Sequence, residues 1–252
     1  MKDKKTGLIQ TLIGAIILVI GIVLCVNTYI VKGNKAYAFS LLVTILGIVI
    51  LIAGLYRTFS KKERKPVDAK VIAQAALCAA LCYVGATFIK IDIPVGTERT
   101  MFHFGNVFCV LAALLIGGEW GGLAGAIGMT ISDLSTAYVT SAPKTFILKL
   151  CIGLIVGFVA HKLFHLSKEH SAKYVTVVSS ICGMAFNIVA DPVVGYFYKT
   201  YLLGVPQDLA KTLAKIGTIT TSVNAVIAVI VASIIYLALR PAMKKLNMLR
   251  DL

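Results

Sequence analysis

The chain has 252 residues, of which 58% are hydrophobic and 14% are charged, and its formal net charge at pH 7 is +14. A soluble domain is about 45–50% apolar and about 25% charged, so the composition excludes a soluble enzyme, a disordered tail or a nucleic-acid-binding domain as the main body. The sequence predicts an all-α integral membrane protein whose basic residues lie in short loops and set its topology.

The first two apolar segments are Leu8–Thr28 and Ala36–Leu55, each long enough to cross about 30 Å of hydrocarbon. The first lacks a small-x-small cleavage site, which favours an uncleaved span over a signal peptide. The basic stretch FSKKERKPVDAK then breaks the composition. We therefore predict an N-terminal transmembrane hairpin (1–60), a basic cytoplasmic linker (61–70) and a six-helix solute-binding membrane domain (71–252). Because its spans carry almost no polar side chain, the hairpin is predicted to be an anchor or an interaction element.

Six further apolar segments follow the basic stretch: Val71–Ile89, Phe102–Ile116, Gly121–Tyr138, Phe146–His161, Tyr174–Tyr198 and about Ile216–Leu239. If the N-terminus is cytoplasmic and the spans alternate, the cytoplasmic segments carry about twice as many Lys and Arg residues as the external ones. The positive-inside rule then predicts a multi-pass cell-membrane protein with eight spans and both termini in the cytoplasm.

Motifs of the common enzyme and metal chemistries are missing from the sequence. The six cysteines lie inside apolar stretches without a CxxC pair, and no HExxH or GxSxG sequence occurs. We expect no metal, no cofactor and no catalytic residue. A Walker A sequence is also absent, so the chain is not expected to hydrolyse ATP itself by the usual route.

Two charged residues, Asp133 and Lys149, stand out in the predicted spans. Asp133 comes late in GGLAGAIGMTISDLSTAY, whose closely spaced glycines allow neighbouring helices to approach. Lys149 lies about one turn inside the next span. Charged groups at such positions are costly unless they face protein or water. Together they suit a pocket for a polar, zwitterionic solute; the alternative is that Asp133 only caps a helix or pairs with Lys149.

Other polar residues of the same six spans complete a candidate substrate-binding set. Asn187 and Asp191 are four residues apart and therefore share a helix face. Interfacial hydrogen bonding would also explain His103, and an aromatic belt at the membrane surface would also explain Tyr196. Behind Asp133 and Lys149, the candidates are Asn106, Asp191, His103, Asn187, Tyr196 and Asn224.

Three runs of the six-helix unit carry a resemblance to a known family: AQAALCAALCYVGA, FHFGNVFCVLAALLIGGEWGGLAGAIGMTISDL and SAPKTFILKLCIGLIVG. On these runs, residues 66–245 resemble the substrate-binding S components of energy-coupling factor (ECF) vitamin transporters. The resemblance implies a six-helix bundle with a ligand pocket near the outer face, capped by the loop at 90–100. The two additional N-terminal spans depart from the six-helix pattern of that family.

The resemblance also implies partners and a transport role. An S component binds a vitamin or vitamin precursor at the outer face and works with a transmembrane coupling subunit and two cytoplasmic ATPases, which drive import. An AxxxA pattern of the first core helix contacts the coupling subunit in that family, and two such pairs fit here, Ala75 with Ala79 and Ala76 with Ala80. The implied partners are therefore these subunits, a small vitamin-like solute and membrane lipid, without nucleic acid.

Three other functions remain open at this stage. An ion-coupled secondary transporter of a small polar solute would use Asp133 and Asp191 as coupling carboxylates. A membrane-embedded enzyme would use His103 or Asp133 as an acid or base. A scaffold would recruit a partner through the N-terminal hairpin (1–60) and bind no small molecule.

Overall fold

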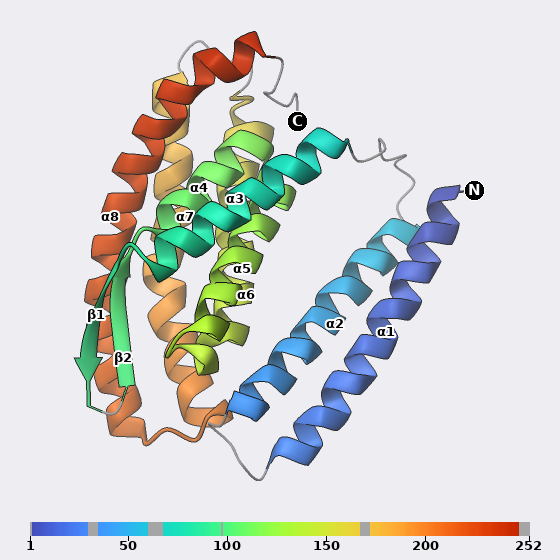
Figure 1. The fold of residues 1–252 in the computed structure, drawn as a ribbon, viewed down its shortest axis with the longest axis vertical. Helices are drawn as coiled ribbons and strands as arrows, with labels where there is room; N and C mark the ends of the chain where they lie inside the picture. The colour runs from blue at the N-terminus through green and yellow to red at the C-terminus, as the bar shows by residue number, and fades with distance from the viewer. Residues whose placement is uncertain (1, 30–34, 60–67, 97, 167–171, 247–252) are drawn as a thin grey trace.

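The computed structural model describes residues 2–29, 35–59, 68–96, 98–166 and 172–246. This part of the chain forms eight α-helices and one two-stranded sheet, whose arrangement is shown in Figure 1. The elements are α1 (Lys2–Thr28), α2 (Lys35–Phe59), α3 (Ala69–Thr87), β1 (Lys90–Val95), β2 (Glu98–His103), α4 (Gly105–Ile116), α5 (Gly118–Ser135), α6 (Ala142–Gly157), α7 (Ala172–Phe197) and α8 (Gln207–Lys245). A 3-10 turn (Val139–Ser141) precedes α6, and π-helical turns (Phe158–Leu163, Tyr198–Leu202) extend α6 and α7. Most of the predicted linker (61–70) falls outside the described residues.

All eight predicted spans contain a helix, but only six described helices are long and apolar enough to cross a membrane. These six are α1, α2, α3, α6, α7 and α8, with α6 and α7 counted together with their flanking turns. Helix α4 has 12 residues, which extend about 18 Å and fall short of a hydrocarbon core of about 30 Å. It begins inside the bundle, where β2 ends (Figure 1). Six of the eight predicted spans therefore meet both conditions in the described residues, and the two others, α4 and α5, pack among them.

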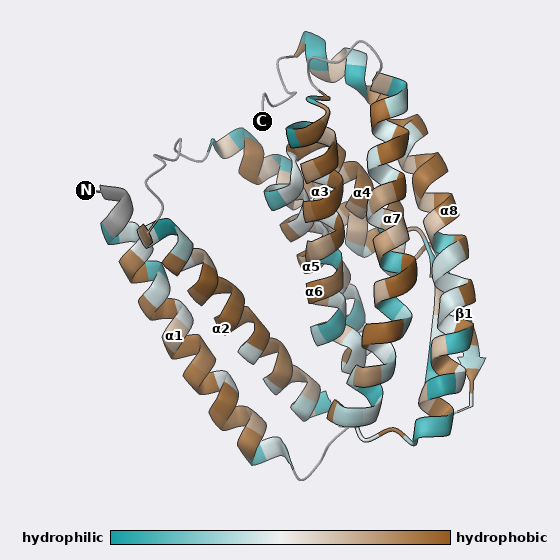
Figure 2. Cartoon of the chain, turned by 180° about the vertical axis from the view of Figure 1, so that it is seen from behind, coloured by the Kyte–Doolittle hydropathy of each residue, from teal (hydrophilic) through white to brown (hydrophobic). Residues whose placement is uncertain are grey.

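The N-terminal hairpin, α1 and α2, is held together by glycines at heptad spacing. A Cβ atom on Gly14 of α1 would collide with the backbone of Leu51, and one on Gly47 of α2 would collide with the backbone of Leu18. Missing side chains at these positions let the two backbones approach closely, as in many membrane helix pairs. Figure 2 shows that both helices are hydrophobic along almost their whole length.

Helix α2 joins the hairpin to the rest of the molecule. Leu42 packs with Ala126 of α5 and Phe146 of α6, and Tyr37 packs with Tyr198 at the end of α7. Helix α1 lies on the outer side of α2 (Figure 1). The hairpin is therefore an additional layer on one side of the six-helix unit.

Glycines also set the spacing of α3, α5 and α6, as their pattern predicts. A Cβ on Gly153 of α6 would meet the Cα of Gly122 of α5, and one on Gly128 of α5 would meet the carbonyl of Ala79 of α3. Between α4 and α5 the chain reverses at Gly117, whose φ of +85° is a conformation that glycine adopts without strain. Small residues thus bring α4 and α5 into the centre of the bundle.

The segment expected to be an irregular loop at 90–100 is a β-hairpin. Strands β1 and β2 pair antiparallel, with Lys90 opposite His103 and Val95 opposite Glu98. The β-branched residues Ile91, Ile93 and Val95 alternate along β1, which is a strand pattern. We call this β-hairpin (residues 90–96 and 98–103) the cap.

The apolar core and the polar interior occupy different parts of the bundle. Large fully buried side chains of the core include Leu114 of α4, Val156 of α6, Met184 of α7 and Tyr236 of α8. Hydrophilic residues gather instead along the stretch of α6, α7 and α8 that lies beside the cap (Figure 2). Packing is thus provided by one end of the bundle, which leaves the other end available for a polar site.

Candidate solute-binding site

A cavity of about 120 Å³ lies beneath the cap, at the end of the bundle where the polar residues gather. Its wall is built by β2, α4, α5, α6, α7 and α8, together with the turns that flank α6 and α7. No described residue of the N-terminal hairpin, of α3 or of β1 lines it. The site therefore belongs to the six-helix unit and is closed on one side by the cap.

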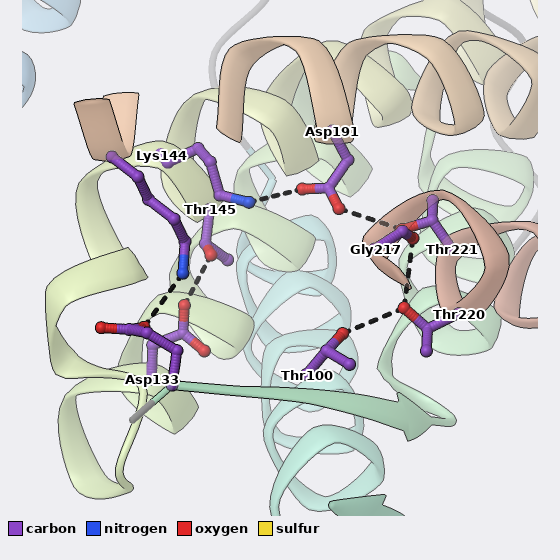
Figure 3. Close-up of polar contacts among 10 residues, drawn as sticks. Thr100, Asp133, Lys144, Thr145, Asp191, Gly217, Thr220 and Thr221 are labelled. Atoms are coloured by element: carbon purple, nitrogen blue, oxygen red, sulfur yellow. Dashed lines mark hydrogen bonds and ion pairs between the residues drawn. The ribbon is translucent and has the colours of Figure 1, made fainter. Parts of the chain in front are cut away.

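One wall of the cavity is a completed ion pair. Lys144 Nζ of α6 lies 2.6 Å from Asp191 Oδ1 of α7, and the hydroxyl of Thr221 of α8 donates to Asp191 Oδ2 at 3.0 Å (Figure 3). Asp191 lies one residue before Pro192, which has no N–H to donate to the preceding turn of α7. Both oxygens of Asp191 are thus occupied by residues of two neighbouring helices.

Asp133 and Lys149 face the same cavity without forming an ion pair. Asp133, near the end of α5, is 2% exposed and accepts a hydrogen bond on Oδ2 from the hydroxyl of Thr145 (Figure 3). Lys149 is 6% exposed, and its ammonium has neither a hydrogen bond nor an ion pair within the described part of the chain. The lysine that pairs with a cavity carboxylate is Lys144.

Two buried amides add unsatisfied acceptors to the wall. Asn106, in the first turn of α4, and Asn187, one turn before Asp191 in α7, are each 1% exposed. The side-chain oxygens of both lack a hydrogen-bond partner among the described residues. Because most buried polar atoms in proteins are hydrogen-bonded, these two mark a place where another molecule can supply the donors.

His103 and Asn224 hold the cap against the bundle. The side chain of Asn224 on α8 accepts from the backbone N–H of His103 at 3.0 Å and donates to the carbonyl of Met101 at 3.1 Å. The Nδ1 of His103 accepts from the N–H of Gly105 at 3.1 Å, so the neutral ring carries its proton on Nε2. Both residues line the cavity, but both ends of the Asn224 side-chain amide are engaged in positioning β2.

Four more contacts fasten the cap. The hydroxyl of Tyr138 donates to Asp92 at 2.8 Å and to the carbonyl of Thr100 at 3.1 Å, and the hydroxyls of Thr100 and Thr220 lie 2.9 Å apart. An ion pair of 3.0 Å joins Glu98 of β2 to Lys199. These contacts reach the cap from the α5–α6 connection, from the turn that follows α7 and from α8, and so hold the cap over the cavity.

The hydrogen bond between Tyr138 and Asp92 affects the pKa of both groups. Burial acts to raise the pKa of Asp92, but the hydrogen bonds from Tyr138 and Lys90 outweigh it and hold the pKa below its ordinary value. Burial, followed by the hydrogen bond to Asp92, raises the pKa of Tyr138. Donor and acceptor therefore keep the protonation states that this contact needs.

The structure brings seven of the eight predicted substrate-binding residues to one cavity: Asp133, Lys149, Asn106, Asp191, His103, Asn187 and Asn224. Tyr196 lies outside its wall and packs edge-on against Phe197, with ring centroids 5.4 Å apart. Sequence reasoning did not select Thr145, Tyr138 or Lys199, because nothing in their local sequence indicates which distant residues they meet.

The alanines predicted to contact a coupling subunit divide into two pairs on α3. Ala75 and Ala79 are partly buried and pack against the core, whereas Ala76 and Ala80 are exposed. Exposed apolar residues surround the second pair, among them Leu77, which is 63% exposed. The outer pair, Ala76 and Ala80, is therefore the more accessible to another protein.

Comparison with known proteins identifies the family of this membrane bundle. The family model for the S component of the ECF-type riboflavin transporter matches residues 67–241. The chain belongs to this family. The match covers the six-helix unit and leaves the N-terminal hairpin outside, so this S component is a multi-pass membrane transport subunit with two added helices.

A curated relative gives little further information on this S component. The "Uncharacterized protein in gap 3'region" of Pyrococcus woesei is 32% identical over 75 residues, which is 30% of this chain and 50% of the relative. The chain thus spans about half the length of this relative. No solved structure matches the chain.

Proposed function

We propose that this protein is the substrate-binding subunit of an ECF-type ABC transporter and captures a vitamin or vitamin precursor at the outer face of the cell membrane. The observation that supports this most is the polar cavity beneath the cap, in a chain of the S-component family. A capture site needs an enclosed pocket with a few placed polar groups. Buried Lys149, Asn106 and Asn187 supply such groups without partners in the described residues.

The proposed orientation has both termini in the cytoplasm and the cavity toward the outside. One end of the molecule holds the tip of the cap and the connection between α7 and α8. The opposite end holds the start of α3 and the end of α8 (Figure 1). Connections at the cavity end carry fewer Lys and Arg residues than those at the other end. The positive-inside rule therefore supports this orientation.

A direct test of solute capture is mass spectrometry of small molecules released on denaturing protein purified from rich medium. We expect a stoichiometric solute from the wild type. We expect none from a double variant, Asn106→Leu with Asn187→Leu, which keeps side-chain volume but removes both amides from the cavity. A folded wild-type protein that releases no solute and binds none on titration would contradict solute capture.

We propose further that a transmembrane coupling subunit, bound to two ATPases, contacts the outer alanine pair on α3. Ala76 and Ala80 offer a flat, exposed surface on which another helix can pack closely. We expect Ala76→Trp to abolish co-purification with the coupling module while solute binding is retained. The matched control is Ala185→Trp, because Ala185 is an exposed alanine on α7; co-purification lost equally in both variants would contradict this surface.

In the proposed function, the N-terminal hairpin (1–60) takes no part in solute binding. Its described residues do not line the cavity, and only α2 packs on α5 and α6. We therefore propose that it is an anchor or an interaction element. Ion-coupled transport is the alternative function, and it differs in what drives uptake.

A further inference from the structure

We propose that the cavity holds a compact acid: a solute about the size of one ring, with one carboxylate and several N–H or O–H donors, and not a three-ring flavin. This inference rests on the proposed function, because it names the class of solute captured at the same site. It is carried by the charge, the hydrogen-bonding groups, the volume and the ring content of the wall.

One unpaired cation of the wall favours a carboxylate on the solute. Basic side chains on the wall are Arg99, Lys144, Lys149 and Lys199, and the acidic ones are Asp133 and Asp191. Two of these lysines are neutralised by ion pairs with Asp191 and Glu98, and Arg99 is exposed at the surface. Lys149 is left as a buried cation and Asp133 as a buried carboxylate, neither of them in an ion pair within the described residues. A carboxylate on the solute supplies the charge-assisted hydrogen bond that Lys149 lacks.

The remaining free groups of the wall are acceptors. Asp133 is hydrogen-bonded only through Oδ2 within the described residues, and the oxygens of Asn106 and Asn187 have no partner there. Acceptors of this kind require N–H or O–H groups on the solute. A neutral apolar ring would leave them unsatisfied, at a cost that disfavours its binding.

The volume of the cavity favours a solute of about one ring. A cavity of roughly 150 Å³ accommodates benzene, and this one measures about 120 Å³. Pockets for larger organic ligands run from roughly 300 to 1,000 Å³. A three-ring solute with a polyol side chain is larger than the space beneath the cap in this arrangement.

The wall also lacks a free aromatic face for a flat, extended ring system. Among the described residues, Tyr138 and His103 are the ring side chains that line the cavity. The hydroxyl of Tyr138 is taken by Asp92 and Thr100, and Lys90 Nζ lies 5.2 Å from its ring centroid. Neither Phe102 nor Phe104 is on the wall. Recognition therefore depends on charge and hydrogen bonds more than on stacking.

Binding of matched acid and neutral probes to the purified full-length protein tests this proposal. Orotate and uracil share one ring and differ in the carboxylate, as do nicotinate and nicotinamide, and riboflavin serves as the three-ring probe. We expect each acid to bind at least about tenfold more tightly than its neutral partner. Riboflavin is expected to bind no more tightly than the neutral probes.

Variants of Lys149 separate its charge from its packing. Lys149→Met should weaken binding of the acids by about tenfold or more, leave the neutral probes unchanged and so remove the selectivity for acids. Lys211→Met is the matched control, because the Lys211 side chain is 57% exposed and lies outside the cavity wall. If Lys149→Met does not fold, Lys149→Gln serves the same purpose, and the wild-type ratios decide on their own.

The outcomes distinguish a failure of this inference from a failure of the proposed function. Tight riboflavin binding, equal affinity for acid and neutral partners, or selectivity that survives Lys149→Met overturns the compact acid and leaves solute capture standing. If no probe binds, the solute released from the purified protein decides: a one-ring acid supports the inference and a flavin overturns it. An empty protein that also binds no probe overturns both.

Discussion

Replacing Lys149 with methionine is expected to stabilise the ligand-free protein while removing its affinity for acids. Lys149 is 6% exposed, and its ammonium has no partner in the described residues. Desolvation of a buried ion costs several kcal/mol, and replacing buried ions by apolar side chains of similar volume stabilises some proteins by about 1–4 kcal/mol. We expect a gain of about 2 kcal/mol, which in a chain of this size raises Tm by about 4–8 °C.

The contrasting variant is Lys144→Met on the same helix. Lys144 holds Asp191 through an ion pair of 2.6 Å, so removing it leaves a carboxylate with only the hydroxyl of Thr221. Loss of a hydrogen bond to a charged group costs about 1.5–3 kcal/mol. Lys144→Met should therefore lower the stability of the protein, whereas Lys149→Met, five residues further along the same helix, should raise it.

Thermal unfolding in detergent, followed with a thiol-reactive dye, measures both shifts. Cys82 and Cys109 are free and fully buried, so the dye reacts with them as the bundle opens. Solute must be removed first, because a bound ligand stabilises the folded state. A Tm of Lys149→Met that falls as far as that of Lys144→Met would refute the reasoning, since it would mean that Lys149 is paired in the folded protein.

The other predictions concern packing, the cap and pH. Gly153→Ala should lower stability by about 1–3 kcal/mol because its Cβ meets Gly122. Gly217→Ala, with no atom within 4 Å of its Cβ, should raise stability by about 0.5–1 kcal/mol. Equal thermal shifts of the two variants would contradict the packing described for α5 and α6. Asn224→Leu leaves two backbone groups of the cap unpaired and should lower stability by about 2–4 kcal/mol and speed solute dissociation, measured by ligand chase. Tyr138→Phe should lower Tm by an amount that is constant from about pH 5 to 9. That difference should shrink below about pH 4, as Asp92, with its lowered pKa, takes up a proton; a difference that grows toward low pH would contradict this contact.

Much of the site could be predicted from the sequence because charged and amide groups are rare in membrane spans. Asp133, Lys149 and Asn106 stood out for that reason, and all three line one cavity. Their partners could not be predicted. Whether Lys144 or Lys149 reaches a carboxylate of α7 depends on how α6 is rotated about its axis, and the spacing along one helix does not specify that rotation.

The cap shows a second limit of sequence reasoning. The alternation of Ile91, Ile93 and Val95 is a strand signal, but a segment between two membrane spans was interpreted as a loop. Contacts such as Thr100 with Thr220 join residues 120 positions apart, and no local pattern indicates such pairs. The glycine spacing, in contrast, predicts that α5 packs closely on its neighbours, although it does not indicate that α6 is one of them.

The measurement that tests the central claim most directly is uptake into proteoliposomes that contain this protein with its coupling subunit and ATPases. We expect accumulation of the solute released from the purified protein only when all components are present and ATP is on the cytoplasmic side, and we expect it to persist when ionophores remove ion gradients. Uptake by this chain alone that needs no ATP and collapses with an ion gradient would contradict the account and favour an ion-coupled secondary transporter.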